Sequence, residues 1–197
     1  MHKACFTLEG FKWHSVEQYL QFKKAEFFKD YYCMDKIKSA ISPKECKYWG
    51  GLVRKFSMKL WEDHAKRACY RGNKAKYNQN PELKRKLIAT KGKYLVEASP
   101  HDHRFGIGMG LDDEFLLDNM KFWGQNWQGG CLEYLRGEFI KEDNAQNLNK
   151  LNGNNIVLSG NTHGRTSGNT ASKGKTNDDK VDTPMEVDQQ AVLETLV

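Results

Sequence analysis

Three side chains near the N-terminus stand at a spacing that suits acid–base chemistry. Glu17, Gln21 and Lys24 follow one another at helical intervals, so in a helix they form a polar row along one face. A carboxylate, an amide and an amine in a row could act as acid or base, orienting group and cation. A solvated face with a favourable glutamate in the first helical turn explains the same spacing more simply, and both interpretations stay open.

A second polar cluster follows Tyr94–Ala98, an apolar run that predicts a β-strand. Polar groups at a strand end often bind ligands. Asp102 is therefore a candidate general base or partner of ribose hydroxyls, and Phe105 a candidate for stacking on a base or an ordinary core aromatic. His101 and His103 supply only half of a zinc site without a third ligand, so we predict no metal.

A third cluster contains Gly124, Asn126, Gly129 and Gly130, at the expected start of the last helix. Glycine-rich backbone at a helix N-terminus presents free N–H groups, which suit a phosphate. Turns use the same residues, so the pattern alone is a weak signal.

Residues 54–93 form a basic run, with 13 Lys and Arg against 3 Asp and Glu. Such a run favours a polyanion or a phosphate-bearing ligand through its electric field. It also permits a nucleic-acid-binding interpretation, although a solvated helix face is the commoner explanation.

The elements that must position these clusters are mostly helical. Gly10 supplies the turn of a hairpin between Phe6–Leu8 and Phe11–Trp13. Further elements follow from capping residues and apolar spacing. We predict helices from Ser15 to about Lys29, from Ser42 to Gly51, over 57–77, from Pro81 through Ile88, and from about Gln128 to Glu142. The fold class is therefore α+β, mostly helical, with a little sheet at each side of the helices.

The composition divides the chain into a domain at 1–142 and a polar tail at 143–197. All 23 aromatic residues and all five cysteines lie in the first part, so we expect the tail to be disordered. The tail ends in Thr195-Leu196-Val197, a weak match to peptides whose C-terminal carboxylate is bound by strand addition. With no apolar run long enough for a membrane span, we expect no membrane association. An odd number of cysteines without a CxxC pair, and no signal-peptide pattern at Met1–Gly10, favour a reduced intracellular protein, so we expect a cytoplasmic location, or a nuclear one.

Three blocks in order resemble the NADAR family, the YbiA-like N-glycosidases. The first is Trp13–Ala25, and the second combines Leu87–Thr90, Tyr94–Pro100, Asp102 and Phe105–Gly108. The third is Gly124-Gln125-Asn126 with Gly129, Leu132 and Arg136. Together these blocks cover roughly Cys5–Phe139 of the chain.

That resemblance implies hydrolysis of an N-glycosidic bond, without metal or cofactor, in ribosyl-phosphate or ADP-ribosyl compounds. The implied substrates are riboflavin-pathway intermediates with a ribosylamine, or ADP-ribosylated guanine, either free or in nucleic acid. It assigns catalysis to Glu17, Lys24 and Asp102. It assigns substrate binding to Trp13, Gln21, Phe105, Gly106, Gly124 and Asn126.

The sequence departs from the family pattern in three ways. We expect the family's first strand, before the hairpin, to be missing, and Phe105 stands where the family has Trp. Gln128-Gly129-Gly130 and Glu133 replace more apolar family residues. Two alternatives therefore stay open beside the enzyme: a catalytically degenerate module that binds ADP-ribose or a nucleotide, and a basic nucleic-acid-binding protein.

Overall fold

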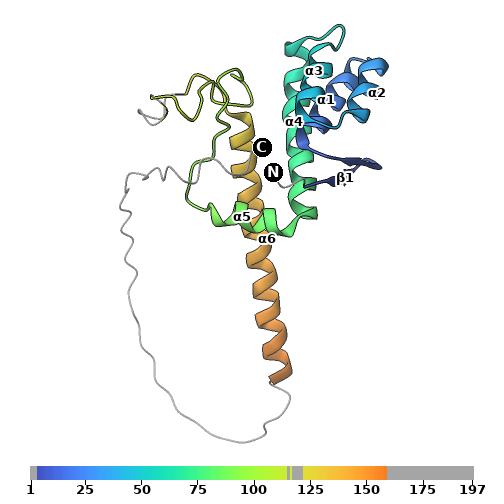
Figure 1. Cartoon of the computed structure of the whole chain (residues 1–197). Coiled ribbons are helices and arrows are strands. Elements are labelled where there is room, and N and C mark those ends of the chain that lie inside the picture. Colours follow the sequence, from blue (N-terminus) through green and yellow to red (C-terminus); the bar gives the residue numbers. More distant parts are fainter. Residues whose placement is uncertain (1–3, 115, 117–121, 159–197) are drawn as a thin grey trace, which may run out of the picture.

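The computed structural model describes residues 4–114, 116 and 122–158. Within them the chain forms one two-stranded sheet and six helices (Figure 1). These are β1 (Phe6–Leu8), β2 (Phe11–Trp13), α1 (Val16–Phe27), α2 (Tyr31–Ser39), α3 (Pro43–Gly51), α4 (Met58–Gln79), α5 (Pro81–Ala89) and α6 (Trp127–Leu158). The predicted α+β, mostly helical class is confirmed.

The hairpin forms as predicted because its two turn residues adopt a left-handed backbone. Glu9 has φ 55° and Gly10 has φ 74°, the conformation that tight hairpin turns require. The strands pair antiparallel, with Phe6 opposite Trp13.

Side-chain caps fix the starts of the first helices. The hydroxyls of Ser15 and Ser42 accept hydrogen bonds from the backbone N–H groups of Gln18 and Glu45, as the sequence predicts. Helix α2 is an element that the sequence analysis did not predict, and Asp30 caps it in the same way.

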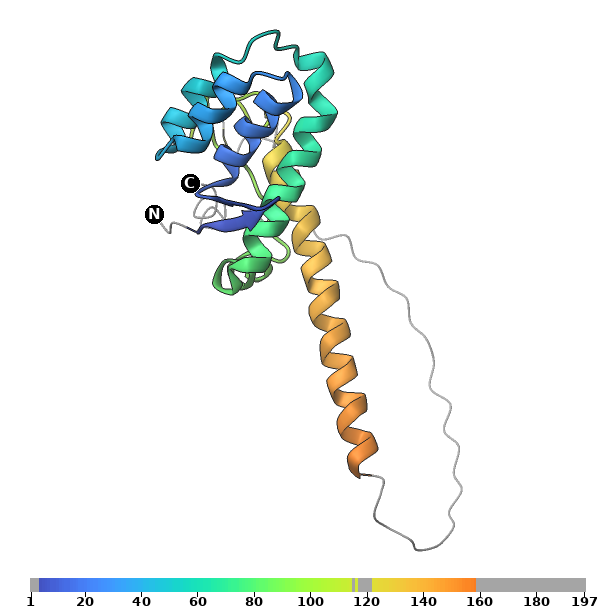
Figure 2. The same cartoon turned by 90° about the vertical axis from the view of Figure 1, so that its right-hand side faces the viewer.

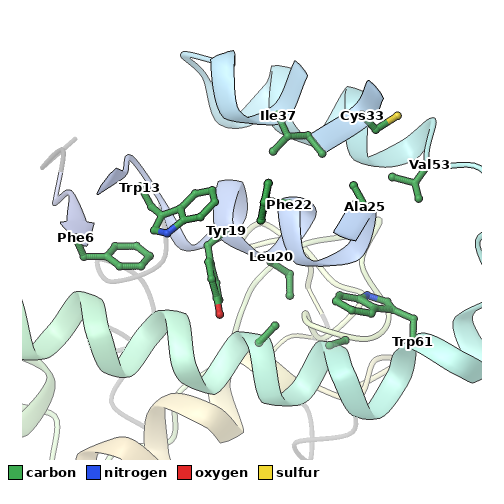
Figure 3. Close-up of a cluster of buried hydrophobic side chains, with 12 residues drawn as sticks. Phe6, Trp13, Tyr19, Leu20, Phe22, Ala25, Cys33, Ile37, Val53 and Trp61 are labelled. Atoms are coloured by element: carbon green, nitrogen blue, oxygen red, sulfur yellow. The ribbon is translucent and has the colours of Figure 1, made fainter. Parts of the chain in front are cut away.

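Helix α1 lies at the centre of the larger hydrophobic core (Figure 3). The hairpin covers its N-terminal end through Trp13, α2 packs on it through Ile37, and α4 packs on its other side through Trp61. Tyr19 and Phe22 of α1 are both buried in this core. The burial of these apolar side chains fixes the position of α1 in the domain. The backbone positions of the side chains on the face of α1 outside this core are therefore fixed as well.

A smaller core joins α4, α5 and α6. Its buried members are Tyr77, Leu87, Leu95, Leu132, Leu135 and Phe139. Beyond this core α6 projects away from the rest of the described chain (Figures 1 and 2).

The prediction of a strand at Tyr94–Ala98 is wrong. The segment has no strand partner among the described residues. Two of its backbone N–H groups instead donate to side chains, Leu95 N–H to Glu133 and Glu97 N–H to Asn126. The apolar pattern that predicts a strand belongs to an irregular segment in which Leu95 and Val96 are buried.

The predicted end of the last helix at Glu142 is also wrong, because α6 continues to Leu158. Residues 143–151 contain no proline or glycine to stop it, and Leu148 and Leu151 lie exposed on it. Residues 159–197 lie outside the described part, so the predicted disorder there and the C-terminal Thr195-Leu196-Val197 motif stay predictions.

None of the helices in the described part of the chain combines the length and the apolar character that crossing a bilayer needs.

Candidate active site

The polar row predicted on α1 is present. Gln21 Nε2 donates to Glu17 Oε1 at 2.8 Å, so the amide holds the carboxylate in one orientation. The other amide atom, Gln21 Oε1, is buried and accepts no hydrogen bond from the described residues. It faces Gly50 of α3, where an added Cβ would lie 1.9 Å from it. Gly50 thus leaves the space that lets Gln21 position Glu17.

Lys24 lies one turn further along the same face. Its ammonium group stands 5.0 Å from the centre of the Phe56 ring. Burial lowers the pKa of Lys24 below its usual range, while the Glu17 carboxylate partly opposes that shift. Lys24 is therefore a half-buried amine near a carboxylate, with an increased tendency to become neutral.

Glu97 is the site residue that the sequence analysis missed. It follows the buried residues Leu95 and Val96, and burial raises its pKa to about 7. The nearby carboxylates of Asp102 and Glu17 add to this increase, and the Lys47 ammonium opposes it. Glu97 is thus a carboxyl group that keeps its proton near neutral pH.

The effects of these charged groups on the pKa of Glu97 indicate that three separate parts of the chain lie close together. Glu17 comes from α1, Lys47 from α3, and Glu97 and Asp102 from the long connection between α5 and α6. The carboxyl groups differ in surroundings, since Glu97 is desolvated while Glu17 is fixed by an amide. When two neighbouring carboxyl groups lie in different environments, one can stay protonated and act as the acid while the other is ionised and acts as the base.

Asp102 also shapes the connection that carries Glu97. Its Oδ1 accepts the backbone N–H groups of Arg104 and Phe105, at 2.9 and 2.8 Å. This turn places the Phe105 ring edge-on to Trp127, with ring centres 5.3 Å apart. Phe105 is partly buried against the larger core. This position is compatible both with stacking on a bound base and with an ordinary core aromatic.

Asn126 joins the two ends of the connection. Its Oδ1 accepts Glu97 N–H at 3.0 Å and its Nδ2 donates to Leu95 O at 2.8 Å. The residue is 6% exposed and has φ 53°, which asparagine tolerates better than most residues. Asn126 therefore holds the backbone that carries Glu97.

The expected phosphate cradle at residues 124–128 is not free to bind a ligand. The five backbone N–H groups of these residues all donate to carbonyls within residues 103–107. An added Cβ on Gly124 would come within 2.3 Å of Gly106 O. The prediction of free N–H groups is therefore wrong. Gly106 and Gly124 let the segments 103–107 and 124–128 approach closely enough to form these backbone hydrogen bonds.

Trp13 lies in the core. Its side chain is 1% exposed and its indole N–H donates to Leu8 O at 3.0 Å. The structure therefore gives it the role of supporting α1 from the hairpin side.

Comparison with known proteins places this arrangement in a family. The sequence model of the NADAR domain matches residues 1–140. The chain belongs to the NADAR domain family.

Relatives agree with this assignment. N-glycosidase R617 of Acanthamoeba polyphaga mimivirus is 36% identical over 124 residues, which are 63% of this chain and 73% of that protein. The chloroplastic riboflavin biosynthesis protein PYRR of Arabidopsis thaliana is 34% identical over 121 residues, 59% of this chain but 18% of that protein. The NMR structure of the Escherichia coli protein YbiA matches with a TM-score of 0.58 and 26% identity, covering 72% of this chain and 76% of that one.

Within this NADAR domain six of the nine predicted site residues form two groups. Glu17, Lys24 and Asp102 lie near one another together with the unpredicted Glu97. Gly106, Gly124 and Asn126 build the backbone behind them. The signal that could have revealed Glu97 is its charge inside an otherwise apolar run of four residues, Leu95–Ala98.

Proposed function

We propose that this NADAR protein is an N-glycosidase that hydrolyses the bond between a ribosyl carbon and a base nitrogen. The observation that carries the proposal is an amide-held carboxylate, Glu17, near a partly buried carboxyl group, Glu97, whose pKa is raised to about 7. The name of the mimiviral relative, an N-glycosidase, supports the reaction class.

The two carboxyl groups suit the two requirements of the reaction. As the C–N bond breaks, the ribosyl ring gains oxocarbenium character, and the negative Glu17 stabilises that positive charge. The departing base needs a proton, which the protonated Glu97 donates. Water then adds its hydroxide to the anomeric carbon, and its remaining proton restores Glu97.

Lys24 offers a second route for the same cleavage. When the ribosyl ring opens, the base nitrogen is held at the anomeric carbon as a protonated imine, and a neutral amine can add to that carbon. The bond to the base nitrogen then breaks, the base leaves with the proton that the amine gives up, and water hydrolyses the remaining Schiff base to the free sugar and the lysine amine. The lowered pKa of Lys24 favours this role. We assign the essential step to Glu17 and leave Lys24 as the sugar-facing amine.

The substrates that we propose are phosphorylated ribosylamines of riboflavin biosynthesis, or ADP-ribosylated guanine. The PYRR name of the Arabidopsis relative supports the first class. Asp102 would reach the ribose through Oδ2, the oxygen that its turn does not use, and Phe105 would contact the base. Since the backbone N–H groups of residues 124–128 are already bonded, side chains rather than this backbone must hold the phosphate.

A release assay tests the proposal. The purified chain is incubated with a ribosylamino-pyrimidine phosphate and, separately, with ADP-ribosyl-guanosine, and the free base is measured by mass spectrometry. We expect base from one of them. Binding of both compounds without release would contradict the enzyme and favour the nucleotide-binding module.

A further inference from the structure

A pocket lies on the side of α1 away from the carboxyl groups. It is a cavity of about 260 Å³ between α1 and α4. Because an α-helix turns about 100° per residue, its α1 members Tyr19, Lys23 and Glu26 lie across the helix from Glu17 and Gln21. Figure 3 shows Tyr19 and Trp61 directed into the space between these two helices. The proposed glycosidase mechanism uses none of the lining residues.

One side of this α1–α4 pocket is aromatic. The His64 ring lies parallel to that of Trp61, 6° between planes and 6.3 Å between centres. The Phe27 ring lies 4.2 Å from His64. His64 is exposed and Trp61 is buried, so the rings form a supported surface open to solvent. Planar bases stack readily on such a surface.

The rim of the pocket carries more positive than negative charge. Lys23 pairs with Glu9 and Glu26, and Arg71 pairs with Glu9. Arg67, also on the rim, has no carboxylate within ion-pair distance among the described residues. An exposed guanidinium without an acidic partner is well suited to a phosphate, which it can bind through two parallel hydrogen bonds.

The surrounding charge and the pocket size narrow the ligand class. Arg67 and Arg71 belong to the basic run of residues 54–93, which concentrates anions near α4. The volume of about 260 Å³ lies below the range of roughly 300–1,000 Å³ that is usual for small-molecule pockets. It therefore suits one nucleotide unit with part of it in solvent.

We propose that the α1–α4 pocket binds the phosphate and base of a single nucleotide, with Arg67 on the phosphate and the His64 ring beneath the base. This ligand could be a free nucleotide or one unit of a single strand. The proposal is independent of hydrolysis at Glu17.

Calorimetric titration of the full chain with adenosine 5′-monophosphate tests this site. We expect Arg67→Ala to weaken binding at this pocket at least tenfold. The matched control is Arg85→Ala, which removes an exposed arginine of the same basic run and should change the Kd less than twofold. Equal losses in both variants, or no loss with Arg67→Ala, would overturn the proposal, and far-UV circular dichroism verifies that each variant is folded.

Two further arms separate this pocket from the glycosidase site and identify the ligand source. If both sites bind nucleotide, the wild type shows two binding events; Lys24→Ala removes the one at the glycosidase site, and Arg67→Ala removes the one at the α1–α4 pocket. If the glycosidase site does not bind nucleotide, the wild type shows a single binding event, and Lys24→Ala leaves it unchanged. Tighter binding of a short single-stranded oligonucleotide, with steep salt dependence, indicates a strand as the source. Similar affinity for both ligands indicates the free nucleotide. Equal affinity for ribose 5-phosphate, which lacks the base, would exclude the stacking surface.

Discussion

Glu97 shows how one residue's chemistry is set by its surroundings. An ordinary glutamic acid ionises near pH 4.5, so it cannot donate a proton at neutral pH. Burial raises the Glu97 pKa to about 7, and therefore the folded protein keeps the acid form up to roughly that pH. The residue is positioned through its backbone, because Asn126 accepts its N–H and Ile107 N–H donates to its carbonyl.

The pH dependence of base release tests this role. Above about pH 7 Glu97 loses its proton, so the wild-type rate should fall as the pH rises from 7 to 9. Glu97→Gln should lower the rate by roughly 10²–10⁴-fold, the usual contribution of a general acid, and should remove the alkaline decrease. Initial rates between pH 5 and 9 measure both effects. An alkaline decrease that persists unchanged in the variant would assign it to another group.

At the scale of the elements, the contact between α3 and α1 tunes the site. A methyl group at residue 50 would meet the Gln21 amide, whereas Gly51 has open space around its Cβ position. We expect Gly50→Ala to displace Gln21 and reduce base release at least tenfold with little loss of stability, because a flexible side chain can move. Gly51→Ala is the matched control and should keep the wild-type rate. Equal rates in both variants would show that Gln21 does not position Glu17.

The start of α6 depends on another close contact. A Cβ on Gly129 would come within 2.1 Å of Leu95 O, while Gly130 has nothing nearby. Since backbone cannot move as a side chain does, Gly129→Ala should lower the free energy of unfolding by about 2 kcal/mol. Gly130→Ala should leave it unchanged or increase it slightly, because alanine favours helix. Urea unfolding of both variants measures the difference, and similar midpoints would contradict this packing.

The same elements show what a sequence can predict. The hairpin, the caps at Ser15 and Ser42 and the row on α1 follow from local rules, and all are present. The strand at Tyr94–Ala98 fails because its partners are side chains of Glu133 and Asn126, more than 25 residues away. Glu97 was missed for a similar reason, since its pKa depends on burial that only the tertiary structure creates.

At the scale of the whole molecule, the domain is held by the larger core, the smaller core and a third cluster of Val96, Ile107 and Met109, and α6 extends beyond them (Figures 1 and 2). Among the described residues, the ion pair between α6 and the rest of the domain that lies furthest along α6 joins Glu142 to Lys84 of α5, and Leu148 and Leu151 beyond it are exposed. A chain ending at residue 142 should therefore unfold within about 1 kcal/mol of the full-length protein and release base at the same rate. Thermal and urea unfolding of the two chains provide the measurement. A larger loss of stability would mean that residues 143–197 contact the domain.

The central claim is that a carboxylate on α1 drives N-glycosidic cleavage. The most direct test of this claim compares Glu17→Gln with the wild type. Released base is followed by mass spectrometry under saturating substrate, with Glu142→Gln, an exposed glutamate on α6, as the matched control. We expect the wild type and Glu142→Gln to release base at equal rates, and Glu17→Gln to bind substrate and release none. Release by Glu17→Gln at the wild-type rate would contradict a role of this carboxylate in the cleavage.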